Sequence, residues 1–114
     1  MLCSMSKIVV HNGTVYTSGQ TAADAGSSIE EQTRACLDKV DALLEQAGTN
    51  KSHALQATIW VKDIAADFKG MNGIWNAWVD PSNKPVRATV QADMARPAIL
   101  VEIQVTAALP PSTS

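Results

Sequence analysis

Hydrophobic and polar residues follow two different periods along the chain, one typical of strands and one typical of helices. The chain is predicted to begin with a hairpin of two strands. Residues 7–10 and 14–18 are rich in β-branched side chains, which favour strands. The pair Asn12-Gly13 between them suits the positive φ angles of a type I′ turn. Residues 20–26 mix Thr, Ala, Asp and Gly with neither period, so we expect a loop there.

A helix is predicted after this loop. Residues at helical spacing form its inner stripe: Ile29, Thr33, Cys36, Val40, Leu43, Leu44 and Ala47. Ser27 or Ser28 can cap the N-terminus, because Glu30 or Glu31 follows three places on and completes a capping box. Gly48 supplies the stop signal.

The middle of the chain predicts a buried strand followed by a second helix. Residues 54–61 carry little polar alternation, as expected for a central strand. The helix begins near Ile64, and its apolar stripe consists of Ile64, Phe68, Met71, Ile74 or Trp75, and Trp78. Pro81 prevents the helix from continuing.

The last two elements are predicted strands. Residues 86–92 and 99–107 alternate strictly between apolar and polar side chains, with Pro97 in the loop between them. The element order is therefore ββαβαββ. Two helices packed on one face of a mostly antiparallel sheet satisfy this order, which makes the expected fold class α+β.

We expect the last two strands to form a hairpin with one polar face. If its loop closes so that Ala92 faces Ile99, then Thr89 lies opposite Glu102 and Arg87 lies on the diagonal. The polar face would hold Arg87, Thr89, Gln91, Glu102, Gln104 and Thr106, and the apolar face Ala88, Val90, Val101, Ile103 and Val105. A guanidinium and a carboxylate would then share one surface.

The length, the net charge and the lengths of the apolar runs indicate how many domains and which kinds of partner to expect. The 114 residues suit one domain, 1–114, whose ends, 1–6 and 109–114, are expected to be flexible. The formal net charge of -2 supplies no electrostatic reason to bind a polyanion, so nucleic acid is not an expected partner. No apolar run has the length of a membrane span and no signal peptide is evident, so we expect no membrane partner and a cytoplasmic location.

Motifs for metals, cofactors and nucleophilic catalysis are missing from the sequence. Cys3 and Cys36 have no CxxC or histidine spacing, so neither a disulfide nor a metal site is expected. There is no phosphate-binding glycine loop and no dinucleotide fingerprint, so no cofactor is implied. Ser18 lacks a GxSxG elbow, and His11 and His53 have no acidic neighbour placed to orient them as bases.

Arg87 and Glu102 are the strongest candidates for a role in binding or catalysis. Arginine offers a planar fork of donors that matches a carboxylate, and glutamate can hold a water molecule or move a proton. From the pattern alone, the simpler interpretation is two charges on the solvated face of a sheet. Ser18-Gly19 ends a strand where glycine permits close approach of a ligand to the backbone, although from the sequence pattern a strand end with a turn glycine is the favoured explanation.

The three tryptophans have two possible interpretations. Trp60, Trp75 and Trp78 could form a stacking surface for a ligand. They lie in an apolar strand and on the apolar stripe of a helix, where core or subunit packing is commoner. We therefore interpret them as packing residues.

Several short motifs together resemble the RidA/YjgF family of reactive intermediate deaminases. They are Ser18-Gly19-Gln20, Glu31-Gln32-Thr33-Arg34, Thr58-Ile59-Trp60-Val61-Lys62-Asp63, Pro85-Val86-Arg87-Ala88-Thr89-Val90 and Leu100-Val101-Glu102-Ile103. They occur in order and with similar spacing over residues 15–107. The combination is more specific than any one motif.

The resemblance implies a chorismate-mutase-like fold and a homotrimer with clefts between neighbouring subunits. Arg87 matches the arginine that holds the substrate carboxylate, and Glu102 matches the carboxylate that positions the attacking water. Thr89 would offer its backbone N–H and Gly19 its backbone carbonyl, beside Ser18. The implied reaction is hydrolysis of a 2-imino acid, or its enamine tautomer, to a 2-keto acid and ammonia, without a cofactor.

One departure from the family pattern opens an alternative. Typical members begin with a Gly-Pro-Tyr-Ser-like segment, whereas only residues 1–6 precede the first expected strand here, and Tyr16 lies inside the second. Trp75 and Trp78 also stand where smaller aromatic residues are common. The alternative is a non-catalytic protein that binds small carboxylates, such as 2-keto acids, in the same cleft.

Overall fold

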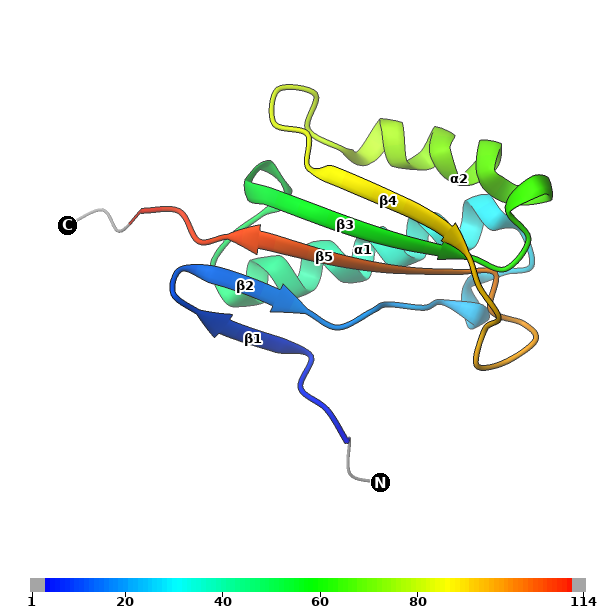
Figure 1. Ribbon diagram of the computed structural model, residues 1–114, viewed down its shortest axis with the longest axis horizontal. Coiled ribbons are helices and arrows are strands. Elements are labelled where there is room, and N and C mark those ends of the chain that lie inside the picture. The colour runs from blue at the N-terminus through cyan, green and yellow to red at the C-terminus, as the bar shows by residue number, and fades with distance from the viewer. Residues whose placement is uncertain (1–3, 112–114) are drawn as a thin grey trace.

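One mixed five-stranded sheet, with two helices on one of its faces, forms the protein. The computed structural model describes residues 4–111; residues 1–3 and 112–114, which belong to the ends expected to be flexible, lie outside the described residues. The elements are β1 (Ile8–His11), β2 (Thr14–Thr17), α1 (Ile29–Ala47), β3 (Ala54–Val61), α2 (Ile64–Trp78), β4 (Val86–Gln91) and β5 (Val101–Ala108), with 3-10 turns at Ala23–Ala25 and Lys51–His53. The expected ββαβαββ order and the α+β class are confirmed (Figure 1).

The opening hairpin forms as the Asn-Gly pair predicts. Asn12 and Gly13 both have positive φ angles, 51° and 75°. Because both turn residues are left-handed, the twist of the turn matches that of the two strands. Val10 lies opposite Val15 across the hairpin, and β2 continues the sheet through antiparallel pairing with β5.

Helix α1 begins with the predicted capping box, and the structure selects Ser28 over Ser27 as the cap. The Ser28 side chain accepts a hydrogen bond from the Glu31 backbone N–H at 3.1 Å, and the Glu31 carboxylate accepts one from the Ser28 backbone N–H at 3.3 Å. Gly48 ends the helix with φ 91°. The helix boundaries therefore follow from local side-chain chemistry.

Replacing Ser28 tests this cap. Ser28→Ala is expected to lower the free energy of unfolding by about 1 kcal/mol, because the first turn loses its side-chain acceptor. Urea denaturation followed by circular dichroism measures the change. Ser27→Ala, one residue earlier and exposed, is the matched control and is expected to change it by less than about 0.5 kcal/mol. Equal losses in the two variants would contradict the assignment of the cap.

The expected hairpin between the last two strands is wrong. The strand order is β1-β2-β5-β3-β4, so β3 separates β4 from β5. β4 pairs with β3 in parallel through the crossover helix α2, and β5 pairs antiparallel with β3 on its other side. The loop of residues 92–100 passes the end of β3: Ala92 donates its N–H to Val61 at 3.1 Å, and Lys62 donates its N–H to Leu100 at 3.0 Å.

The core lies between the helices and one face of the sheet. It contains the inward residues of β3 and β5, which include Ala57, Ile59, Val101, Ile103 and Val105, all fully buried. Trp75 and Trp78 of α2 join this core with ring centroids 5.2 Å apart, which confirms the packing interpretation for these two residues. The other face of the sheet carries no helix in Figure 1. Neither α1 nor α2, the helices of residues 4–111, is long and apolar enough to cross a membrane.

Candidate functional site

Helix α2 holds the Arg87 side chain from one side. Arg87 is paired with Ala57 of β3, so its side chain points to the helical face of the sheet. Its Nη1 donates a hydrogen bond to Asn72 Oδ1 at 2.8 Å, and its guanidinium carbon lies 5.4 Å from the Trp75 ring centroid and 5.9 Å from that of Phe68. Cation–π contacts on two rings and one hydrogen bond fix the orientation of the guanidinium.

The Arg87 guanidinium keeps its charge and most of its N–H donors for a ligand. Burial lowers the pKa of Arg87, but an arginine remains charged at neutral pH. The bond to Asn72 uses one of its five N–H donors, which leaves others for a ligand. β4 is an edge strand, so this guanidinium lies at the rim of the sheet. Such an arrangement suits a carboxylate.

Glu102 lies on the opposite face of the sheet, beside Ser18 and Gly19. The segment after β2 runs along β5, because Gln20 and Ile103 exchange two backbone hydrogen bonds of 2.8 and 3.0 Å. A Cβ added at Gly19 would collide with Glu102 Oε2, so the carboxylate packs directly on the glycine. Gln20 Nε2 donates to both the Ser18 carbonyl, at 3.0 Å, and Ser18 Oγ, at 3.1 Å.

Thr89 belongs to the Arg87 side of the site. It lies two residues along β4, paired with Ile59, and its side chain therefore shares the face of Arg87. Its Oγ1 is buried without a hydrogen-bond partner among residues 4–111. The predicted site residues thus form two groups: Arg87 with Thr89, and Glu102 with Ser18 and Gly19.

The expectation that Arg87 and Glu102 share one face is wrong. Glu102 is paired with Trp60, three positions along β3 from Ala57, the partner of Arg87. Adjacent strands lie about 4.8 Å apart and each residue advances about 3.3 Å, so two strands and three residues separate the two Cα atoms by roughly 14 Å. An odd number of positions also places the side chains on opposite faces. The two groups do not form one site within a single chain.

The contacts of Arg87 with three residues of α2 were not predicted from the sequence. Phe68, Asn72 and Trp75 follow one another at helical spacing of four and three residues, which places them on one side of α2. Phe68 was assigned to the apolar stripe and Trp75 was one of two alternatives for it, with Ile74, whereas Asn72 was not singled out. A polar residue within such a stripe is the signal that could have indicated a partner on the sheet.

Cys36 lies close to the Glu102 group without being a nucleophile. Its Sγ is 3.2 Å from the Gln20 carbonyl oxygen. Burial raises the pKa of the thiol to about 12; the charge of Lys39 opposes the rise and that of Glu102 adds to it. The neutral thiol therefore predominates at physiological pH, and it packs as a small apolar group.

Comparisons with known proteins agree with this fold over nearly the whole chain. A family model described as endoribonuclease L-PSP matches residues 3–109. The RutC family protein YoaB from Escherichia coli (strain K12) is 43% identical over 104 residues, which cover 91% of this chain and 90% of YoaB.

Solved structures extend the comparison. A crystal structure of a member of the YjgF protein family from Neisseria meningitidis superposes with a TM-score of 0.93 at 37% identity, covering 98% of this chain and 92% of the other. A protein of unknown function of the conserved Rid protein family, YyfA from Yersinia pestis, gives a TM-score of 0.87 at 31% identity, covering 96% and 90%. On these grounds the chain belongs to the RidA/YjgF family, to which the endoribonuclease L-PSP model corresponds.

Proposed function

We propose that this protein is a cytoplasmic hydrolase that converts 2-imino acids, or their enamine tautomers, to 2-keto acids and ammonia. The observation that carries the proposal is the Arg87 guanidinium, oriented by Asn72, Phe68 and Trp75 at the rim of the sheet with donors left for a carboxylate. A 2-imino acid presents such a carboxylate next to the reactive carbon. Membership of the RidA/YjgF family supports the same substrate class.

The cleft is proposed to lie between subunits of a homotrimer. Arg87 and Glu102 lie on opposite faces of one sheet, so a ligand that touches both needs residues from two copies. The sheet face without helices exposes apolar side chains, among them Val86 at 71%, Val90 and Tyr16. Such a patch is typical of a surface that another subunit covers. A closed ring of three copies would repeat one Arg87–Glu102 cleft at each interface.

The proposed reaction needs only these protein groups and water. Arg87 of one subunit binds the substrate carboxylate and orients the imine carbon towards a water held by Glu102 of its neighbour. The water oxygen bonds to the carbon of the protonated imine while Glu102 accepts a proton. Glu102 then donates that proton to the nitrogen of the resulting aminoalcohol. The C–N bond breaks while Glu102 accepts the proton of the new hydroxyl group, which leaves the keto acid and ammonia, and the ammonia takes this last proton from Glu102. Because the iminium carbon is already electrophilic, positioning supplies much of the rate.

A coupled assay with 2-aminoacrylate tests the function. The protein is expected to accelerate pyruvate formation, read by lactate dehydrogenase and NADH, and Arg87→Ala is expected to remove the acceleration. No acceleration, together with heat of binding for 2-keto acids by calorimetry, would replace the hydrolase with the non-catalytic carboxylate-binding protein. A monomer by light scattering at micromolar concentration would remove the intersubunit cleft.

RNA cleavage, the activity that the family model's description names, has less support in this chain. The formal net charge is -2, whereas phosphate backbones are bound by clustered Lys and Arg. We expect no RNA binding at low salt in a filter-binding assay. Retention of RNA that disappears on adding salt would contradict this choice.

Gly19→Ala tests the position of the Glu102 carboxylate. The added methyl group displaces a flexible carboxylate and no backbone atom, so kcat/KM is expected to fall roughly tenfold. The free energy of unfolding is expected to change by less than about 1 kcal/mol. Gly73→Ala is the control, because its Cβ meets no atom within 4 Å. Unchanged kcat/KM in Gly19→Ala would remove Glu102 from the reaction.

A further inference from the structure

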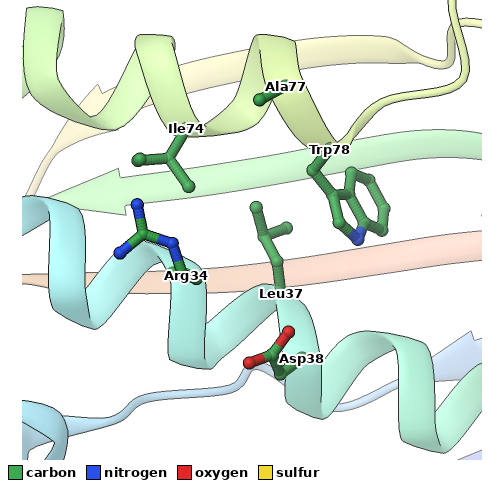
Figure 2. Close-up of a pocket in the computed structure, with 6 residues that line it drawn as sticks. All are labelled: Arg34, Leu37, Asp38, Ile74, Ala77 and Trp78. Atoms are coloured by element: carbon green, nitrogen blue, oxygen red, sulfur yellow. The ribbon is translucent and has the colours of Figure 1, made fainter.

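A hollow lies on the helical side of the molecule, apart from the residues of the proposed cleft. It has a volume of about 200 Å³ and opens between α1 and α2 (Figure 2). Its lining consists of Arg34, Leu37 and Asp38 from α1 and Ile74, Ala77 and Trp78 from α2. Neither Arg87 nor Glu102 contributes to it. The helices cover one face of the sheet, so the hollow remains open when the other face is covered.

The apolar wall of the hollow is held in place. The Trp78 indole Nε1 donates to both carboxylate oxygens of Asp41 at 3.1 Å, and Lys51 Nζ lies 5.4 Å from the ring centroid. The Trp78 ring also packs against Trp75, with 5.2 Å between the two ring centroids. Leu37, which is only 1% exposed, supplies a fixed floor. A preformed apolar surface of this kind needs little reorganisation to receive an aliphatic group.

Two opposite charges flank this apolar wall one helical turn apart. Figure 2 shows the Arg34 guanidinium reaching towards Ile74 and the Asp38 carboxylate below Leu37 on α1, and both side chains contribute to the lining of the hollow. The order Arg before Asp along a helix is the less favourable one for a pair within the helix. A guanidinium suits a carboxylate ligand, and a carboxylate suits an ammonium group.

We propose that this hollow binds an aliphatic α-amino acid as its zwitterion. The ligand carboxylate meets Arg34, its ammonium meets Asp38, and its branched side chain packs on Leu37, Ile74 and Trp78. The size agrees, because an apolar cavity of about 150 Å³ accepts a benzene molecule. The two charges favour a ligand that carries both signs, on two substituents of one carbon, over a purely apolar occupant.

Leucine is the probe, and two analogues remove one charge each. Calorimetry and tryptophan emission are expected to show saturable leucine binding. 4-Methylpentanoate lacks the ammonium and 3-methylbutan-1-amine lacks the carboxylate, and each is expected to bind roughly tenfold more weakly. Equal affinity for all three compounds, or no saturable binding of leucine, would overturn the proposal.

Variants locate the binding. Ala77→Phe fills the hollow from its exposed rim and is expected to abolish leucine binding, whereas Ala65→Phe, at another exposed alanine of α2, is expected to retain it. Arg34→Gln is expected to weaken binding about tenfold without affecting folding, since the residue is exposed. Arg87→Ala is expected to leave leucine binding unchanged. Leucine binding that survives Ala77→Phe and disappears in Arg87→Ala would place the ligand in the other cleft and overturn the proposal, whether or not the protein is a hydrolase.

Discussion

Two inactive variants are expected to restore activity when they assemble together. Arg87→Ala and Glu102→Gln are each expected to lower kcat/KM for 2-aminoacrylate by about a hundredfold or more, because one loses the carboxylate anchor and the other the proton acceptor. After mixing equal amounts in urea and refolding, about one quarter of the parent activity is expected. Random assembly gives each cleft an even chance of an intact Arg87 and, independently, of an intact Glu102.

The recovery depends on the opposite faces of the sheet. Arg87 projects towards α2 and Glu102 projects from the other face, so the proposed cleft takes its two residues from different chains. If both residues of a cleft came from one chain, every cleft in the mixture would lack one of them, and the activity would stay at the level of the single variants. That result would refute the shared cleft while leaving the hydrolase reaction possible.

Each variant refolded alone is the control for the mixture. Both proteins need the secondary structure and the oligomer mass of the parent, checked by circular dichroism and light scattering. The pyruvate yield is then measured against the ratio of the two chains. The recovered activity is expected to be greatest at equal amounts, because the product of the two intact fractions has its maximum there.

Gln32→Met is expected to lower the free energy of unfolding by about 3 kcal/mol or more, the largest stability effect we predict. Gln32 is 1% exposed, and its Nε2 donates to the carbonyls of Gly26 and Ala98, each at 2.9 Å. Its Oε1 accepts from the Leu100 backbone N–H at 2.9 Å. Methionine fills a similar space without these bonds, and a buried polar group left unsatisfied costs about 1–3 kcal/mol.

Urea denaturation of parent and variant measures this loss. Gln46→Met is the matched control, because Gln46 is exposed on the same helix and its replacement is expected to change the free energy by less than about 0.5 kcal/mol. A loss below about 1 kcal/mol in Gln32→Met would mean that the amide does not secure the segment before β5.

Local chemistry made the helix ends and the first hairpin predictable. The Asn12-Gly13 turn and the Ser28–Glu31 capping box each involve residues only a few positions apart. The interacting residues can therefore be recognised within a short stretch of sequence. The strands that lie beside β4 and β5 in the sheet could not be predicted in this way. Alternation tells which residues of a strand share a face, but it does not tell which strand lies beside it. A loop of nine residues, 92–100, is long enough either to close a hairpin or to pass one strand, and here it passes β3.

For the candidate site, the sequence indicates residue types with suitable chemistry but not their arrangement in space. Arg87 and Glu102 were selected for their chemistry, and the two charges are present at the rim and on the uncovered face. Their separation follows from the register of β3, which enters through contacts distant in sequence. Asn72 was missed because, within an apolar stripe, a single amide reveals its role only once the partner strand is known.

The position of β5 between β2 and β3 has a consequence for how the chain folds. It is the last of the described strands to leave the ribosome, yet it is the one that joins the hairpin β1–β2 to the unit β3–α2–β4. Until it arrives, the two parts present unpaired strand edges to each other and to other chains. Its contacts are also far apart in sequence, which slows folding. A nascent chain halted before residue 101 would therefore hold two incomplete half-sheets, each exposed to aggregation.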